Sequence, residues 1–282
     1  MISFKNVSFA YKKGEALLSD INFELRKGNV YGILGLNGAG KTTLLNLATG
    51  MLFPESGSCQ FNGEEVRNRT PKILRELFIV PEQFDLPKLS GEKYTKIHQP
   101  FYPKFVESVL HEILTIFEVD FSKKLSELSY GQRKKFLIAF SIASNARMLF
   151  FDEPTNGLDI PSKSQFRKVI ASLDLEDRSI LISTHQVRDL GMMLDHIIVI
   201  KEGTIVFNQS VEKVTQNLKF KKIEGEHSDE YIYGERTLGG VNAILPATNG
   251  DNSELDLDME LLFNGIIQKT DTINKQFGGV IS

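Results

Sequence analysis

Apolar residues form three short, nearly uninterrupted runs along the chain, at residues 30–34, 148–151 and 180–182. Strands buried on both faces of a parallel sheet show such runs, because neither face has to be polar. The first run ends at Gly35, and the other two end in the polar residues Asp152 and Ser183. The three runs therefore predict the parallel sheet of an α/β protein.

Roughly alternating apolar residues occupy 2–11 and 21–25, with a polar turn between them. Alternation with a period of two is typical of half-buried strands, and a polar connection of this kind favours an antiparallel pair. Two more strands are expected late in the chain, at 196–200 and 204–207, separated by a turn. The pattern thus predicts antiparallel strands beside the parallel sheet.

In the middle of the chain the apolar positions change to helical spacing. They recur about every three to four positions, at Val106, Val109, Leu110, Ile113, Leu114 and Phe117. We therefore expect a helical segment over about residues 87–147.

The last part of the chain, residues 219–282, shows a different pattern from the rest. It predicts a strand, a loop, an amphipathic helix and a disordered end, at 230–238, 248–253, 255–268 and 276–282. We expect a main domain over 1–218 and a small α/β accessory extension after it.

Composition excludes several classes of protein. The longest apolar run is five residues, 136–140, whereas a membrane-spanning helix needs about 20. The N-terminus has no apolar stretch after a basic one, so we expect no secretory signal. With a single cysteine, Cys59, a reducing cytoplasm is the expected compartment. The net charge of −3, without a basic stripe, gives no electrostatic basis for nucleic-acid binding.

A glycine-rich segment, GLNGAGKTT, lies between the strand expected at 30–34 and an apolar stripe that predicts a helix. Its glycines let backbone N–H groups curl around phosphate oxygens at the start of that helix. Lys41 is expected to reach the β- and γ-phosphates, and the Thr42 hydroxyl to ligate Mg²⁺. The candidate nucleotide-binding residues are Gly35, Leu36, Asn37, Gly38, Ala39, Gly40, Lys41, Thr42 and Thr43.

Two carboxylates, Asp152 and Glu153, follow the apolar run at 148–151. Ligands of open α/β sheets bind outside the carboxyl ends of the strands. Asp152 is therefore a candidate Mg²⁺ partner, acting through water. Glu153 is the candidate catalytic group that polarises the attacking water, a role that contributes about 10²- to 10⁴-fold in rate.

A second candidate anion site lies at Ser129. Serine is a good N-cap for the helix expected just after it, and a helix start with free N–H groups attracts anions. Residues 35–43 already supply a complete phosphate cradle, so this second site needs a phosphate from elsewhere. A head-to-tail twofold dimer would meet this need.

Four segments follow one another in a diagnostic order: GLNGAGKTT, LSYGQ, MLFFDEP and STHQ, at 35–43, 128–132, 148–154 and 183–186. Together they resemble the ATP-binding cassette (ABC) ATPases, and LSYGQ is the most specific of the four. The resemblance covers residues 1 to about 214. It implies a P-loop NTPase (RecA-like) core, an antiparallel β subdomain and an inserted helical subdomain.

The resemblance also implies roles for single residues. The signature segment, which contacts the nucleotide of the partner subunit, is Leu128, Ser129, Tyr130, Gly131 and Gln132. Tyr130 stands where the commonest form of the family has glycine. Asp159 matches the D-loop, which communicates across the dimer. His185 resembles the H-loop histidine, which contacts the γ-phosphate and orients the water as a catalytic residue.

Two further positions resemble family sites. Tyr11 matches the aromatic residue on which adenine stacks. The Q-loop, which offers an oxygen to Mg²⁺, matches Glu82 or Gln83. Most members have glutamine directly after the preceding apolar run, where this chain has Glu82, so both positions are candidates.

The chain is thus identified as similar to an ATP-hydrolysing subunit of an ABC transporter, with ATP and Mg²⁺ as cofactors. The resemblance implies two partners: a separate transmembrane permease at the inner face of the cell membrane, and an identical or paralogous ATPase. The compact helical segment and the Phe-Tyr-Pro at 101–103 are most like the exporter-type multidrug and antibiotic branch. The alternatives are a non-transport, single-cassette ATPase of a cytosolic assembly complex and a nucleotide-binding regulator.

Overall fold

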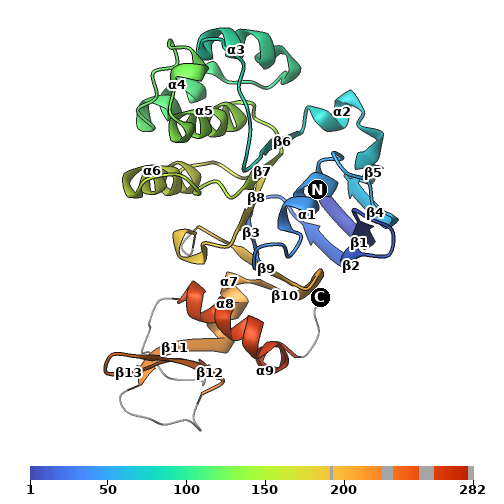
Figure 1. The fold of residues 1–282 in the computed structure, drawn as a ribbon, viewed down its shortest axis with the longest axis vertical. Helices are drawn as coiled ribbons and strands as arrows, with labels where there is room; N and C mark the ends of the chain where they lie inside the picture. Colours follow the sequence, from blue (N-terminus) through green and yellow to red (C-terminus); the bar gives the residue numbers. More distant parts are fainter. Residues whose placement is uncertain (191–192, 224–230, 248–256, 279–282) are drawn as a thin grey trace.

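A six-stranded sheet runs through the middle of the molecule in the computed structural model, which describes residues 1–190, 193–223, 231–247 and 257–278 (Figure 1). The strand order is β10-β9-β3-β8-β7-β6, and all neighbours are parallel except β10 and β9. The strands are β3 Val30–Leu34, β6 Leu77–Val80, β7 Met148–Asp152, β8 Ser179–Thr184, β9 His196–Lys201 and β10 Thr204–Ser210. All three apolar runs therefore form neighbouring parallel strands, as predicted.

A second, antiparallel sheet packs beside the first in the order β2-β1-β4-β5. Its strands are β1 Ile2–Ala10, β2 Ala16–Leu25, β4 Ser56–Phe61 and β5 Glu64–Glu65. The predicted pair is confirmed, although its second strand begins at Ala16 instead of 21. Helix α1, Lys41–Ala48, contributes Leu44, Leu45 and Leu47 to a buried cluster that includes both sheets.

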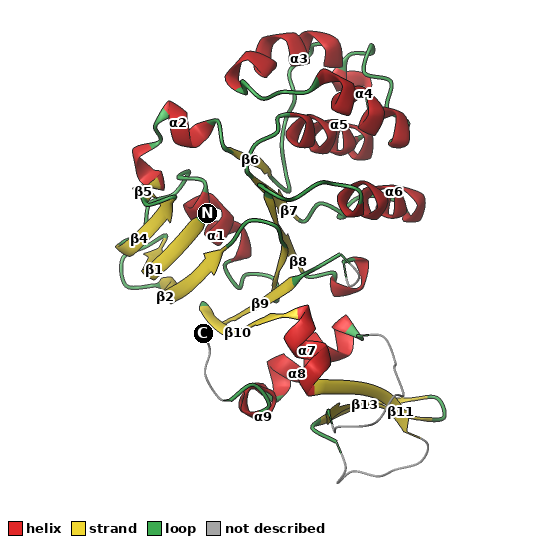
Figure 2. Cartoon of the chain, turned by 180° about the vertical axis from the view of Figure 1, so that it is seen from behind, coloured by secondary structure: helices red, strands yellow, loops and turns green. Residues whose placement is uncertain are grey.

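Helices α3, α4 and α5 lie together at one end of the molecule, beyond β6 (Figures 1 and 2). The helices up to α6 are α2 Pro71–Leu74, α3 Gly91–His98, α4 Glu107–Ile116, α5 Tyr130–Ala143 and α6 Ile160–Ala171. Short 3-10 turns are η1 Val66–Asn68, η2 Gln99–Phe101, η3 Leu125–Glu127 and η4 Val187–Asp189. No described helix has both the length and the apolar character needed to cross a bilayer.

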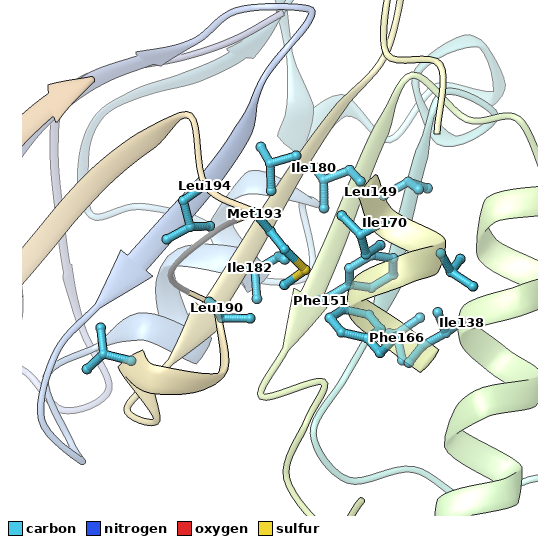
Figure 3. Close-up of a cluster of buried hydrophobic side chains, with 14 of the residues drawn as sticks. Ile138, Leu149, Phe151, Phe166, Ile170, Ile180, Ile182, Leu190, Met193 and Leu194 are labelled. Atoms are coloured by element: carbon cyan, nitrogen blue, oxygen red, sulfur yellow. The ribbon is translucent and has the colours of Figure 1, made fainter. Parts of the chain in front are cut away.

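Helix α5 is the central element of the larger hydrophobic core. Every residue from Lys134 to Ala143 is buried, so the helix has no solvent-facing side over this stretch. Figure 3 shows Ile138 of α5 beside Phe151 of β7 and Phe166 of α6, whose rings meet edge to face at 6.0 Å. This packing joins the helical end of the molecule to the central sheet.

The C-terminal part begins with α7, Val211–Asn217, and forms a three-stranded antiparallel sheet, β11-β13-β12. Its elements are β11 Leu218–Ile223, β12 Tyr233–Thr237, β13 Gly240–Pro246, α8 Met259–Gln268 and α9 Thr270–Lys275. The predicted strand and helix both exist. The helix begins at Met259 because the carboxylate of Asp258 caps it, accepting from the N–H groups of Glu260 and Leu261.

Residues 276–278, the described part of the end that was expected to be disordered, are ordered. Phe277, in the part expected to be disordered, packs edge to face on Phe207 of β10 with 5.3 Å between ring centroids. The predicted loop at 248–253 and residues 279–282 lie outside the described residues. Helix α8 also contributes Leu262 and Ile266 to the same buried cluster as α5. The predicted domain boundary between residues 218 and 219 stays a prediction. It falls inside β11, which begins at Leu218.

Candidate nucleotide-binding site

The glycine-rich loop connects the end of β3 to the start of α1, as the sequence predicts. Gly38 and Gly40 have left-handed backbones, with φ of 81° and 100°. A Cβ on Gly40 would lie 2.6 Å from a methyl carbon of Leu18, so this position needs glycine for both space and conformation. No described side chain caps α1. Its first N–H groups and its dipole are therefore available to an anion.

Lys41 lies across the mouth of this loop with only 7% of its surface exposed. Its ammonium donates to the carbonyl oxygens of Gly35 and Leu36, at 2.8 and 3.2 Å. Oε1 of Glu153 lies 3.8 Å from the same nitrogen. Burial lowers the pKa of Lys41, and the neighbouring carboxylates, chiefly that of Glu153, oppose the shift. The cation is thus held between the first carbonyls of the glycine-rich loop and the carboxylate of Glu153.

Thr42 and Asp152 meet through a hydrogen bond of 2.7 Å from the threonine hydroxyl to Oδ2. The hydroxyl of Ser183 donates to the other carboxylate oxygen. Burial raises the pKa of Asp152, while the hydrogen bonds from Ser183 and Thr42 act in the opposite direction. Two hard oxygen donors of the kind that Mg²⁺ prefers are therefore adjacent where α1 begins and β7 ends.

Glu153 follows β7 and is held by the end of β8. Its Oε1 accepts from the backbone N–H of His185 at 3.0 Å and lies 2.8 Å from the Nδ1 of the same residue. Its Oε2 accepts from the hydroxyl of Thr184 at 3.0 Å. The residue is only 5% exposed. Its carboxylate therefore has one fixed orientation.

The structure distinguishes the two Q-loop candidates. Glu82 lines the same cleft as Lys41 and Glu153, and its Oε1 accepts from the side-chain amide of Asn156 at 2.8 Å. Gln83 is exposed, and it is not among the described residues that line the cleft. Of these two residues, Glu82 is the one that is placed to offer an oxygen to a ligand in the cleft.

One cleft of about 630 Å³ is lined by Lys41, Thr42, Glu82, Glu153 and His185, among others. Tyr11 also lines the cleft; it is 64% exposed, and its hydroxyl is 3.1 Å from that of Thr43. The ring of Phe9 packs edge to face against Tyr11 at 4.9 Å and leaves a ring face free for a flat group. The cleft therefore combines an exposed aromatic ring with a cationic, glycine-rich loop.

The signature segment begins α5 through a capping box. The hydroxyl of Ser129 accepts from the N–H of Gln132, and the side chain of Gln132 accepts from the N–H of Ser129, at 3.2 and 3.1 Å. Among the described residues that line the cleft, none comes from 128–132. The helix start therefore presents an exposed Ser129 that its own nucleotide cleft does not use.

Tyr130 turns toward its own chain. Its hydroxyl donates to the carbonyl of Glu82, and its ring stacks on Phe84 at 5.5 Å. The ring also packs against Gly157, where an added Cβ would meet it at 3.3 Å. The side chain at the position where glycine is commonest thus fastens the signature segment to the end of β6.

A sequence profile for the family described as ABC transporter matches residues 18–156. The ABC transporter ATP-binding protein YtrB of Bacillus subtilis (strain 168) is 30% identical over 207 residues, which cover 73% of this chain and 70% of YtrB. The lantibiotic transport ATP-binding protein SrtF of Streptococcus pyogenes is 30% identical over 214 residues, covering 75% of this chain and 92% of SrtF. The chain belongs to the ABC transporter ATP-binding proteins.

A solved structure agrees with this assignment. A bacterial ABC transporter cassette, determined as a dimer, matches with a TM-score of 0.67 and 25% identity, covering 75% of this chain and 99% of that chain. The protein is therefore an ABC ATPase, the ATP-binding subunit of a transporter. Its predicted fold is confirmed.

Asp159, the D-loop candidate of this ABC ATPase, is exposed and caps α6. Its Oδ1 accepts from the N–H of Ser162 at 2.9 Å. Hydrogen bonds from Ser162 hold the pKa of Asp159 below its ordinary value. Asp159 is not among the described residues that line the nucleotide cleft. Within one subunit its observed role is to begin a helix.

Three residues at the site were not singled out from the sequence: Lys134, Asn156 and Thr184. Thr184 and Asn156 bind the carboxylates of Glu153 and Glu82. Lys134 donates to the backbone carbonyl of Glu153. The sequence carries no clear signal for it, because Lys134 stands between Arg133 and Lys135, and basic residues in such a run are usually exposed.

Among the described residues, no group of three or more His, Cys, Asp and Glu side chains is arranged to hold a metal ion. A complete metal cage is not needed for Mg²⁺, which usually binds one or two carboxylates together with substrate phosphates. The donor set of Thr42, Asp152 and Glu82 fits that arrangement.

Proposed function

We propose that this ABC ATPase binds MgATP between two cassettes and hydrolyses it to drive a separate membrane permease. One observation carries the proposal. The carboxylate of Glu153 is fixed by Thr184 and His185 in the same cleft in which Lys41 closes the glycine-rich loop. Phosphoryl transfer needs positioning and charge stabilisation more than covalent chemistry, and the cleft supplies both.

Nucleotide binding follows from the aromatic ring and the glycine-rich loop that line the cleft. The adenine ring stacks on the exposed face of Tyr11, and the phosphates bind the loop amides at the start of α1. Lys41 then exchanges the carbonyls of Gly35 and Leu36 for the β- and γ-phosphate oxygens. This exchange adds charged phosphate oxygens to the carboxylate of Glu153 as partners of the buried ammonium.

Thr42, Asp152 and Glu82 would hold Mg²⁺ beside the phosphates, with Asp152 acting through water. The ion supplies positive charge that neutralises the phosphate oxygens. The structure supports Glu82 over Gln83 as the Q-loop ligand, because only Glu82 faces the cleft.

Hydrolysis places the attacking water between Glu153 and the γ-phosphate. The oxygen of the water bonds to the γ-phosphorus while Glu153 accepts a proton from the water. The bond between the γ-phosphorus and the oxygen that links it to ADP breaks. His185, hydrogen-bonded to Oε1 of Glu153, orients the water and contacts the γ-phosphate. The products are ADP and inorganic phosphate.

The second anion site supports a dimer. Ser129 is exposed and lies apart from its own cleft, so it is free to complete the cleft of a partner cassette. We assign that contact to the Ser129 hydroxyl and the N–H of Gly131, and we place Asp159 at the same interface. The side chain of Tyr130 is engaged within its own chain, so only its backbone takes part. The partner is a second copy or a paralogous cassette.

The permease binds an apolar groove of about 660 Å³ between the core and the helical end. Met51 and Phe101 line it and are 56% and 65% exposed. Arg69 and Arg75 also line it, so the groove fits a short amphipathic helix with acidic residues. A permease bound there holds the cassette at the inner face of the membrane.

Export is the direction we propose for the transporter. The helical part is compact, as in exporter-type ATPases, and the relative SrtF is named for lantibiotic transport. Reconstitution with the permease tests this: ATP added at the cassette side of sealed vesicles should move substrate to the opposite side. Movement toward the cassette side would show import instead.

Phosphate release from the purified protein tests the core of the proposal. We expect hydrolysis of ATP that stops on chelation of Mg²⁺ and rises when the permease is present. Phe101→Glu should remove only the stimulation by the permease, because it changes the groove and not the cleft. Binding of ATP without any phosphate release would indicate a nucleotide-binding regulator.

A further inference from the structure

Lys134 is the only lysine among the described residues with 0% exposure. It lies in the first half of α5, and its ammonium donates to the carbonyl oxygens of Glu153 and Asn156, at 2.9 and 3.0 Å. An isolated buried ammonium is costly. Its retention here therefore depends on these two carbonyls and on the charges around it.

The peptide at Glu153 needs such support. Its φ is +45°, in the left-handed region, which is unfavourable for a residue other than glycine. Its N–H donates to the carbonyl of Ser183 at 3.0 Å. Its own carbonyl accepts from Lys134 and, at 3.1 Å, from the N–H of Asn156. The backbone of Glu153 is thus held on one side by β8 and on the other by α5.

Charge favours the same arrangement. The carboxylates of Glu82, Glu153 and Asp152 all act on Lys134, and they oppose the lowering of its pKa by burial. A cation at this position balances part of the negative charge that collects beside the cleft. A neutral side chain of similar size would leave both carbonyls with weaker partners.

Lys134 also belongs to the helix that the signature segment begins. Its nitrogen lies 5.2 Å from the centre of the Tyr130 ring, within cation–π range. A rotation of the first turns of α5 therefore moves the ring and the ammonium together. The backbone of Glu153 would follow, because Lys134 is bonded to it directly.

We propose that Lys134 is a positioning residue, which fixes the backbone of Glu153 and passes the position of the signature helix to its carboxylate. The inference rests on the role proposed above for Glu153. It explains how contact of Ser129 with a partner's nucleotide can align the water-activating group of its own cleft. Lys134 is not among the described residues that line the nucleotide cleft.

The test compares kcat, KM for ATP and the affinity for a non-hydrolysable ATP analogue across variants of the full chain. Lys134→Met keeps the length and removes the charge and the donors. We expect kcat to fall about 30- to 100-fold, because a shift of about 1 Å at a reacting group has effects of that size. KM and analogue affinity should change less than about threefold, since the glycine-rich loop is untouched. Lys134→Gln, which keeps N–H donors, should restore at least about tenfold of the loss.

Arg178→Met is the matched control. Arg178 is also a largely buried cation that donates to two backbone carbonyls, those of Ala146 and Ile142, at 3.1 and 3.0 Å, but it does not line the cleft among the described residues. Its loss should lower the melting temperature and leave kcat within about threefold. Lys134→Leu is a second uncharged replacement, which replaces Lys134→Met if that variant does not fold.

A folded Lys134→Met or Lys134→Leu protein with kcat near wild type overturns the proposal. So does a parallel loss of kcat and analogue affinity that simply follows the melting temperature. Glu153→Gln, measured alongside, separates the two claims. If Glu153→Gln hydrolyses ATP normally, the role of Glu153 is wrong; if it is inactive while the uncharged Lys134 variants are normal, only the inference about Lys134 fails.

Discussion

The imidazole of His185 lies 2.8 Å from the carboxylate of Glu153, measured between Nδ1 and Oε1. The two residues are brought together by the parallel register of β7 and β8, in which Asp152 pairs with Ser183. Glu153 is one residue beyond the first partner, and His185 is two residues beyond the second. The contact is therefore a consequence of the sheet, and both members can be tested separately.

Glu153→Gln should abolish turnover while preserving nucleotide binding. The amide keeps the size of the side chain but cannot accept a proton, so kcat should fall about 10²- to 10⁴-fold. Phosphate release and binding of a fluorescent ATP analogue measure the two effects, and gel filtration with ATP should show a trapped dimer. Glu127→Gln, at an exposed surface position, is the control. Near-normal hydrolysis would remove Glu153 from its proposed role.

His185→Ala should also slow hydrolysis, by about 10²-fold, because the water loses one orienting group and Glu153 loses one of its partners. The backbone N–H of His185 and the hydroxyl of Thr184 still hold the carboxylate, so the protein should stay folded. Single-turnover measurements isolate the chemical step. His111→Ala changes an exposed histidine and should have no effect. Equal losses in both variants would point to a general structural cause.

Mixing two inactive variants should restore activity if the signature segment acts on the partner. Ser129→Asp keeps a helix-capping oxygen but places a negative charge at the phosphates. Lys41→Ala removes the cation of the loop. In a mixed dimer, one cleft contains both changes and the other contains neither. We expect up to about half of the wild-type rate per mixed dimer, measured as phosphate release.

Ser90→Asp serves as the control for that experiment, because Ser90 caps α3 in the same way that Ser129 caps α5. The Ser90→Asp protein should be active alone. This result would show that an aspartate at a helix N-cap does not by itself inactivate the protein. If the mixture of Ser129→Asp and Lys41→Ala releases no phosphate although mixed dimers form, the shared-cleft assignment is wrong.

Cys59 should resist thiol reagents as long as the protein is folded. The side chain is buried, and burial raises the pKa of its thiol from 9.0 to about 12. A difference of about three pKa units lowers the thiolate fraction about a thousandfold, and the thiolate is the reactive form. Labelling at pH 8 should be slow in buffer and rapid in denaturant. Fast labelling of the native protein would contradict the burial of β4.

Leu262→Ala should destabilise the ATPase core, although it lies in the C-terminal extension. Leu262 is 0% exposed and belongs to the same buried cluster as Val187 and Leu190, which follow His185. Truncations of buried leucine cost about 2–5 kcal/mol. Denaturation monitored by nucleotide binding measures the change, and Leu238→Ala, at a fully exposed position, should change it by less than about 0.5 kcal/mol. An unchanged core would show that the extension folds independently.

Much of the fold could be predicted because its signals are local. The apolar runs that became β3, β7 and β8 need only their own composition to indicate buried strands. The glycine-rich loop needs only neighbouring residues, since its conformation depends on the φ of Gly38 and Gly40. The order of four such segments was enough to identify the family.

The candidate site depended on contacts between distant parts of the chain. The hydrogen bond between Glu82 and Asn156 joins residues 74 positions apart, and it distinguishes Glu82 from Gln83. No periodicity reports which of two adjacent side chains faces a cleft, because that depends on the direction in which β6 ends. The sequence likewise did not indicate that the ring of Tyr130 stacks on Phe84 of its own chain.

By itself, the sequence determined the buried strands β3, β7 and β8, the phosphate loop and the family, and it indicated the candidate reacting groups, because each is encoded in a few consecutive residues. The tertiary structure decided which of these groups touch. It placed His185 against Glu153, and it buried Lys134 against the backbone of the same residue. Such contacts form only when the register of a parallel sheet and the packing of α5 bring separate segments together. Register and packing depend on several segments at once, so no single segment determines them.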